Sequence, residues 1–129
     1  MLFRSEFTYI GRHQCNFTNR RTKVLPPLTG ESLARALAAN RVYVSGSLWD
    51  PGPNHVLEAL SCGIATWVHR DGGGAVEFAG ADHVYGSVDE LRSILSDHRR
   101  VRAHNTYVPT GWDECIAQYA RMFEGVVSR

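Results

Sequence analysis

The sequence is poor in cysteine, has no strong excess of charge of either sign and contains no long apolar run. Of its 129 residues only Cys15, Cys62 and Cys115 are cysteines, and their odd number and unrelated spacings fit a reducing compartment better than a disulfide framework. The formal net charge is +1, so no bulk field favours nucleic acid or an anionic membrane. No apolar run approaches the length of a membrane span or of a signal-peptide core. We therefore expect a globular, cytoplasmic protein.

Strand-like and helix-like segments alternate along the chain. Strand patterns cover residues 7–11, 22–27, 42–47, 64–70 and 83–86. Helix patterns cover residues 30–40, 54–63, 75–80, 88–100 and 112–126. No repeat, low-complexity segment or linker divides residues 1–129, so a single domain is expected. The alternation predicts an α/β fold with a Rossmann-like parallel sheet and helices on both faces.

Cap residues predict where several of the helices begin and end. Thr29 and Asn54 are predicted as the N-cap residues of two helices, and Ser87 with Glu90 forms a capping box for a third. Gly63 is placed to end the helix that begins near Asn54.

Three loops are expected at one edge of the sheet. Right-handed crossovers place every strand-to-helix loop on the same side, where open α/β sheets bind ligands. The loops are 26–30, 48–54 and 71–74. The third, Asp71-Gly-Gly-Gly, lacks the spacing of a phosphate-binding loop, so a plain turn is the simpler interpretation.

Two carboxylates belong to the second of these loops and the helix after it, in the stretch "DPGPNHVLEALSCG". Asp50 lies in a turn rich in proline and glycine, and Glu58 shares a helical stripe with His55 and Ser61. If that stripe faces solvent, Glu58 is a solvated surface acid. If it faces the ligand edge, Glu58 can accept hydrogen bonds from ribose hydroxyls, beside a helix N-terminus suited to phosphate. The spacing leaves both readings open.

The segment from Ser45 to Glu77 resembles a known family. Asp50-x7-Glu58, followed by "EALSCGIATWVHRDGGGAVE", is similar to the E-x7-E motif of the retaining, group 1 glycosyltransferases of the GT-B fold. The resemblance implies a C-terminal, donor-binding domain of an enzyme that transfers a sugar from a nucleoside diphosphate donor with retention. It implies no cofactor and no metal, and it allows a peripheral membrane association of the full enzyme.

The resemblance also implies roles for individual residues. Glu58 would bind the donor ribose, and Asp50 would bind the hydroxyls of the donor sugar as the catalytic-site acid. The remaining donor-binding positions would be Gly52, Pro53, Asn54, His55 and Val56. Pro26, Pro27 and Leu28 would lie beside the base. Asp50 stands where members of the family more often have glutamate, whose side chain is longer.

Compared with the family, parts of the domain are expected to be missing. Phe7 to Arg12 resembles the second strand of the domain, so the first strand and helix, with an Arg–Lys pair that binds the diphosphate, have no counterpart. Arg12, Arg20 or Arg21 are the candidate substitutes. The acceptor-binding N-terminal GT-B domain is the missing partner, and we expect this fragment to be inactive alone. The alternative from the residues is a non-catalytic nucleotide-binding or partner-binding module.

Other patterns favour structural explanations. His13 and Cys15 lack a second ligand pair with zinc spacing, so a metal site is not expected. The basic run from Asp97 to His104 lacks interleaved aromatic residues, so a solvated helix face is the better interpretation than a nucleic-acid patch.

Overall fold

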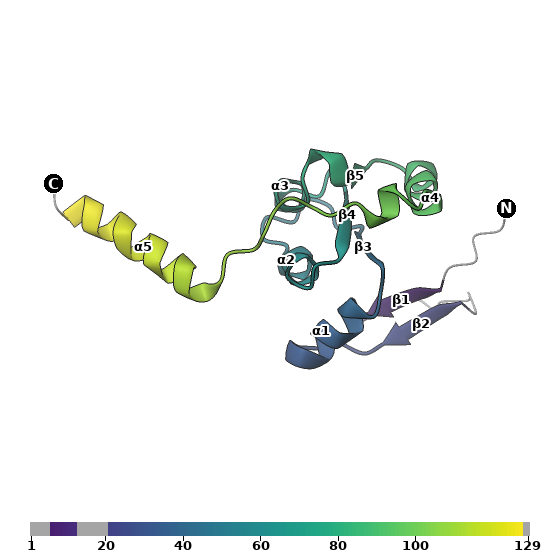
Figure 1. Cartoon of the computed structure of the whole chain (residues 1–129), viewed down its shortest axis with the longest axis horizontal. Helices are drawn as coiled ribbons and strands as arrows, with labels where there is room; N and C mark the ends of the chain where they lie inside the picture. The colour runs from purple at the N-terminus through teal and green to yellow at the C-terminus, as the bar shows by residue number, and fades with distance from the viewer. Residues whose placement is uncertain (1–5, 13–20, 128–129) are drawn as a thin grey trace.

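The computed structural model describes residues 6–12 and 21–127 (Figure 1). The strands are β1 (Phe7–Ile10), β2 (Thr22–Leu25), β3 (Val42–Ser45), β4 (Ala65–His69) and β5 (Val84–Tyr85). The helices are α1 (Gly30–Ala38), α2 (Asn54–Ser61), α3 (Gly74–Ala79), α4 (Val88–Ser96) and α5 (Trp112–Val127), with short 3-10 turns η1 (Ala81–His83) and η2 (Arg100–Arg102). None of the described helices combines the length and the apolar character needed to cross a membrane.

The centre of the fold is a parallel sheet in the order β3-β4-β5. Val42 pairs with Ala65 and Ser45 with Val68, while Val68 and His69 pair with Val84 and Tyr85 on the other side of β4. Parallel strands of this kind are buried on both faces, and β4 accordingly reads as a run of buried residues, Ala65 to Val68.

Helices cover both faces of this sheet. Side chains alternate along β4, so Val68 packs with Val56 and Leu60 of α2 and with the alanines of α3, Ala75 and Ala79. Trp67 points the opposite way and packs with Tyr85 and with Ile94 of α4. The predicted α/β fold with parallel strands and helices on both faces is thus confirmed for this three-stranded unit.

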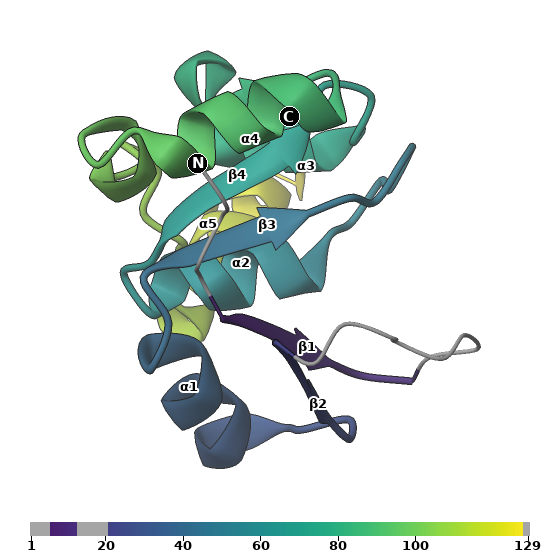
Figure 2. The same ribbon diagram turned by 90° about the vertical axis from the view of Figure 1, so that its right-hand side faces the viewer.

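A second parallel sheet contains only β1 and β2. Phe7 pairs with Thr22 and Ile10 with Leu25. β1 lies between β2 and β3 in all three ribbon views, most plainly in Figure 2, yet β1 and β3 belong to different sheets and are not hydrogen-bonded as neighbours. The edges of β1 and β3 therefore face each other across an unpaired interval.

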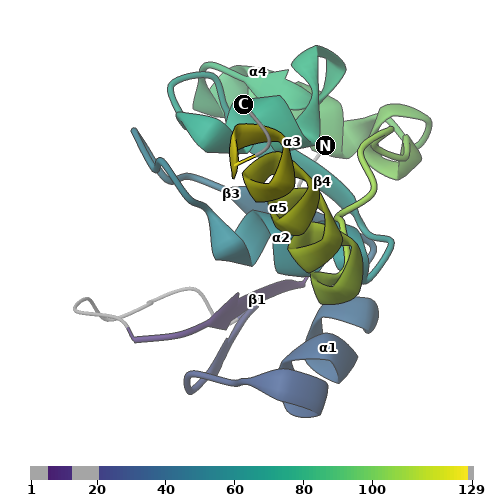
Figure 3. The same cartoon turned by 90° about the vertical axis from the view of Figure 1, so that its left-hand side faces the viewer.

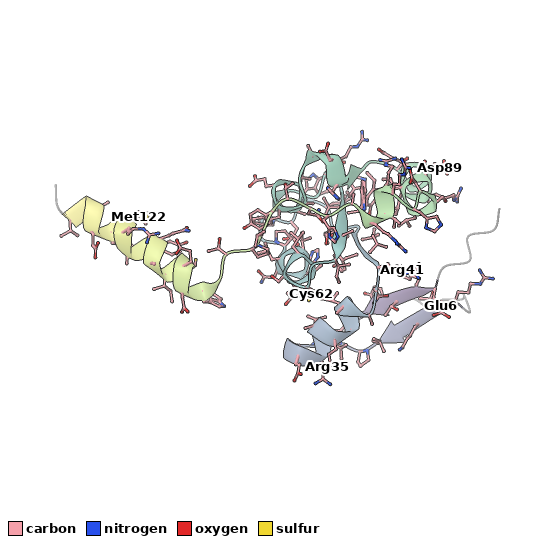
Figure 4. All side chains as sticks on the ribbon, viewed as in Figure 1. Glu6, Arg35, Arg41, Cys62, Asp89 and Met122 are labelled. Atoms are coloured by element: carbon pink, nitrogen blue, oxygen red, sulfur yellow. The ribbon has the colours of Figure 1, made fainter. Side chains whose placement is uncertain are left out.

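The last helix, α5, extends away from the rest of the molecule in Figure 1 and is turned toward the viewer in Figure 3. It contains no buried residue. Its apolar stripe, which the sequence pattern predicts, is exposed and consists of Trp112, Ile116, Tyr119, Phe123 and Val126. Met122, which flanks the stripe, is labelled on the projecting helix in Figure 4.

The helix caps follow the sequence in part. Ser87 accepts a hydrogen bond from the amide of Glu90, as the capping box predicts. Thr29 occupies the N-cap of α1 but makes no side-chain cap bond. The prediction for Asn54 is wrong by one position: it is the first residue of α2, Pro53 is the cap, and no side chain caps this helix. Gly63 follows the C-cap of α2 with φ of +70°, as expected of a residue that ends a helix.

The predicted helix 88–100 ends early, at Ser96. The Asp97 carboxylate accepts hydrogen bonds from the amides of Arg99 and Arg100, and these bonds lower its pKa. They start a separate turn in which the Arg100 guanidinium lies 5.5 Å from the ring centroid of Trp67. The basic run is therefore a capped turn and not the expected helix face.

Candidate functional site

The loops after β3 and β4 are joined at the carboxyl edge of the sheet. The amide of Trp49 donates to the carbonyl of Asp71 at 2.7 Å, and the amide of Gly74 donates to the carbonyl of Asp50 at 2.9 Å. Asp50 and Gly73 also form a parallel bridge outside the named strands. The prediction that these two loops share an edge is confirmed, and their bonding makes them one rigid unit.

The glycines of the loop after β4 make this approach feasible. A Cβ on Gly73 would lie 2.7 Å from the carbonyl oxygen of Asp50, and one on Gly74 would lie 2.9 Å from that of Pro51. Gly73 also has φ of +66°, which disfavours other residues. The amide of Gly74 already donates a hydrogen bond to the carbonyl of Asp50 and is not available to a ligand. These contacts favour the interpretation of this loop as a turn required for packing.

Asp50 is held by its own turn and by a histidine. Its Oδ1 accepts a hydrogen bond from the amide of Gly52 at 3.1 Å. Its Oδ2 lies 3.4 Å from Nε2 of His55, on the first turn of α2. The same Nε2 lies 3.3 Å from the hydroxyl of Ser47. The carboxylate of Asp50 is therefore oriented in the free protein.

Tyr43 completes this cluster from strand β3. Its hydroxyl lies 2.9 Å from Nδ1 of His55. Burial, and secondarily the charge of Glu58, raises the pKa of Tyr43 to about 12, so the phenol is protonated at neutral pH. A protonated phenol donates to Nδ1 when the imidazole proton is on Nε2, and Nε2–H then points at Asp50 and Ser47. The geometry favours this tautomer because the alternative would set a nitrogen lone pair against a carboxylate.

Glu58 lies one turn further along α2 and is exposed. Its carboxylate has no hydrogen-bond or ion-pair partner among the described residues. Its charge contributes to the raised pKa of Tyr43 in the cluster. The structure thus brings both predicted carboxylates to one loop-and-helix unit: Asp50 with fixed orientation and Glu58 with free acceptor oxygens.

The other predicted donor-binding positions divide into two groups. Gly52 and Asn54 are exposed, whereas the side chains of Pro53 and Val56 are buried in the core. Pro53 and Val56 can therefore offer only backbone atoms to a ligand. The amides of Gly52, Asn54 and Val56 donate within their own turn, to Asp50, Gly52 and Pro53 respectively. A diphosphate bound at these amides would have to displace those bonds.

The predicted base region lies on the loop after β2. Pro26 and Pro27 are exposed and Leu28 is half-buried. The backbone hydrogen bonds that join the other two loops do not reach this one. Of the candidate phosphate-binding cations, Arg12 and Arg21 are exposed, while Arg20, like His13 and Cys15, lies outside the described residues.

Sequence reasoning missed Tyr43, Ser47 and Trp49. Tyr43 lies in β3, and Ser47 lies two residues after its end. Only the fold reveals that their side chains contact His55, which is twelve and eight positions further along the chain. Trp49 has φ of +52°, a conformation that no sequence pattern predicted. A usable signal was its place directly before Asp50 in a turn.

A concave region lies at the opposite edge of the sheet. It is a cavity of about 290 Å³, and its lining includes Arg41, Cys62, Arg102 and His104. Arg41 and Cys62 are both labelled in Figure 4. Helices α1 and α2 end here, so the cations complement the negative ends of two helix dipoles and have a structural explanation. The described residues contain no group of three His, Cys, Asp or Glu side chains arranged to hold a metal.

Comparison of the chain with protein-family models, with curated proteins and with solved structures finds no match.

Proposed function

We propose that this chain is a donor-binding α/β domain of a retaining, nucleotide-sugar-dependent glycosyltransferase. In this proposal Glu58 accepts hydrogen bonds from the ribose hydroxyls of a nucleoside diphosphate sugar, and Asp50 binds the hydroxyls of the sugar. The proposal rests on the resemblance of the Ser45–Glu77 segment and on the geometry of the two carboxylates.

The observation that carries it is the contrast between the two acids. Asp50 is fixed by the Gly52 amide and faces His55, whereas Glu58 has no partner among the described residues. A structural acid would be paired, and a site that binds a neutral polyol needs free acceptor oxygens in a fixed frame. Both acids lie at the carboxyl edge of the parallel strands, where doubly wound folds bind ligands.

The interval between β1 and β3 also supports the proposal. One further parallel strand between them would join the sheets in the order β2-β1-new-β3-β4-β5. That is the strand order of the classic dinucleotide-binding fold, in which the first strand is central. A domain of the proposed family would supply this strand, and the exposed edges of β1 and β3 would then be paired.

The chemistry proposed for the complete enzyme is electrostatic. Departure of the nucleoside diphosphate leaves negative charge, and positioned donors that stabilise this charge lower the barrier. Asp50 would hold the sugar while the bond to the diphosphate breaks, and Glu58 would anchor the nucleoside. The apolar stripe of α5 would pack against the second domain, which would supply the acceptor site.

Calorimetric titration of Glu58→Gln tests the proposal. Each charged hydrogen bond contributes on the order of 1.5–3 kcal/mol, so affinity for UDP, ADP or GDP and their sugar conjugates should fall roughly 10- to 100-fold. Glu31→Gln, which changes another exposed helical glutamate, is the matched control and should not alter affinity. The melting temperature of Glu58→Gln should be unchanged, because glutamine suits a helix nearly as well.

Asp50→Asn separates the roles of the two acids. It should reduce the affinity for the nucleotide sugar and leave the affinity for the free nucleoside diphosphate unchanged. Equal losses for both ligands would show that the roles are misassigned. If the wild-type chain binds no nucleotide, a partner-binding module becomes the better account, and binding without transfer in the completed enzyme would favour a non-catalytic nucleotide-binding module.

A further inference from the structure

Trp49 combines an unfavourable backbone conformation with an exposed side chain. Its φ is +52°, and it is the one non-glycine residue with positive φ in the described part of the chain. Its side chain is 78% exposed. A single exposed tryptophan needs no explanation by itself, but a bulky residue in the left-handed region costs free energy and calls for one.

The conformation of Trp49 is imposed by its neighbours. Its amide donates to the carbonyl of Asp71 at 2.7 Å, and the next residue, Asp50, bridges Gly73. The loop is anchored further by Pro53, which is buried in the core. Glycine would occupy this position without strain, as it does at Gly73 across the bridge. The conformation of this turn would be less strained with glycine, so the tryptophan side chain points to a role outside the fold.

We propose that Trp49 is a stacking platform for the apolar face of a hexopyranose ring whose hydroxyls are bound by Asp50. The inference rests on the proposed function and deepens it by assigning a sugar subsite. A pyranose presents C–H groups on its faces and hydroxyls at its rim. An indole next to an oriented carboxylate matches both, because aromatic faces pack against apolar ring surfaces while the carboxylate accepts from hydroxyls.

The rigidity of the joined loops strengthens this assignment. A platform lowers the entropic cost of binding only if it is held before the ligand arrives. The backbone on both sides of Trp49 is hydrogen-bonded to the loop after β4, and Asp50 is oriented by Gly52 and His55. The backbone that carries the indole and the hydroxyl acceptor therefore belong to one preformed unit.

The test compares a nucleotide sugar with its free nucleoside diphosphate by calorimetry. UDP-glucose, ADP-glucose and GDP-mannose are titrated against UDP, ADP and GDP. Trp49→Ala should reduce the affinity for the nucleotide sugar by roughly 3- to 10-fold and leave that for the free diphosphate unchanged. Trp49→Phe should retain most of the affinity, because a ring remains.

Two further variants exclude a merely structural role. Trp49→Gly should raise the melting temperature, since it relieves the strained φ. It should still reduce the affinity for the nucleotide sugar, because the stacking ring is gone. Trp112→Ala removes another exposed tryptophan, 83% exposed on α5, and should change neither affinity nor melting temperature. Sugar-dependent quenching of tryptophan fluorescence should persist in Trp112→Phe and disappear in Trp49→Phe.

Failure of the inference is distinguishable from failure of the proposed function. Nucleotide sugars that bind Trp49→Ala as tightly as the wild type overturn the stacking role while the nucleotide site stands. Absence of any nucleotide binding overturns the proposed function; the fluorescence titration is then repeated with glucose and maltose. A response to these sugars that Trp49→Phe abolishes supports the platform, and no response overturns it as well.

Discussion

The three-stranded unit and the two ends of the described chain differ in how their apolar residues are covered. The buried residues that form the core lie between Leu37 and Ile94. Neither β1, β2 nor α5 contains a buried residue, although each follows its sequence pattern. Local propensity was thus satisfied in these three elements, while close packing among the described residues was reached around β4, where helices cover both faces of the sheet.

The candidate site belongs to the better packed region. Asp50, His55 and Glu58 are positioned by β3, α2 and the loop after β4, each tied to the central core. Rigid elements hold binding groups more accurately than mobile ones. Uncovered faces at the two ends are instead the places where further polypeptide would add stability.

The largest expected contrast concerns two tryptophans. Trp67→Ala should reduce the free energy of unfolding by about 3–5 kcal/mol, because Trp67 is 2% exposed in the core. Trp112→Ala on α5 should change it by less than about 0.5 kcal/mol. Urea denaturation measures both. A comparable loss at Trp112 would show that α5 is packed in solution and would break the comparison.

Glycine substitutions sharpen the comparison within the well-packed region. In Gly63→Ala the added Cβ meets open space, and the destabilisation comes from the φ of +70° alone. The free energy of unfolding should therefore fall by about 1 kcal/mol. Gly73→Ala adds a clash with the carbonyl of Asp50 and should cost at least about 2 kcal/mol. Equal losses in thermal or urea unfolding would mean that the two loops separate easily, contrary to their hydrogen bonding.

Tyr43→Phe should have a smaller effect, about 1 kcal/mol at neutral pH, because it removes one half-buried hydrogen bond to His55. The pKa of Tyr43 is raised in the folded state to about 12 from 10.0, so folding favours the protonated phenol. The contribution of Tyr43 to the free energy of unfolding should therefore be complete below pH 10 and decrease as the pH rises toward 12. Tyr43→Phe should remove this part of the pH dependence. An unchanged alkaline profile would contradict the burial of Tyr43.

The smallest expected effect on stability is at Phe123, which is 61% exposed on α5. Phe123→Ser should leave the free energy of unfolding within about 0.5 kcal/mol of wild type. It should nevertheless reduce binding of a hydrophobic dye and the sedimenting mass, because the apolar stripe of α5 favours self-association. Arg92→Gln, at an exposed ion-paired site on α4, is the control that should change neither. A wild-type chain that is monomeric and binds no dye would contradict the exposed stripe.

The positions of most elements could be predicted from sequence because their causes are local. The stripe of α5, the capping serine at position 87 and the alternation of strands and helices all depend on residues close together in the chain. Boundaries were less secure: α2 begins at Asn54 instead of after it, and α4 ends at Ser96 because Asp97 binds the following amides. At Asp97 side-chain hydrogen bonds competed with helix propensity.

By itself, the sequence determined the α/β class, the shared loop edge and the pairing of Asp50 and Glu58 on one loop-and-helix unit, since each follows from spacing and crossover handedness. Only the tertiary structure decided that Tyr43 and His55 orient Asp50, that Gly73 must be glycine and that Trp49 is left-handed. It also separated β1 from β3 and left α5 uncovered. These features depend on contacts between segments distant in the chain, and no local pattern encodes whether such surfaces meet.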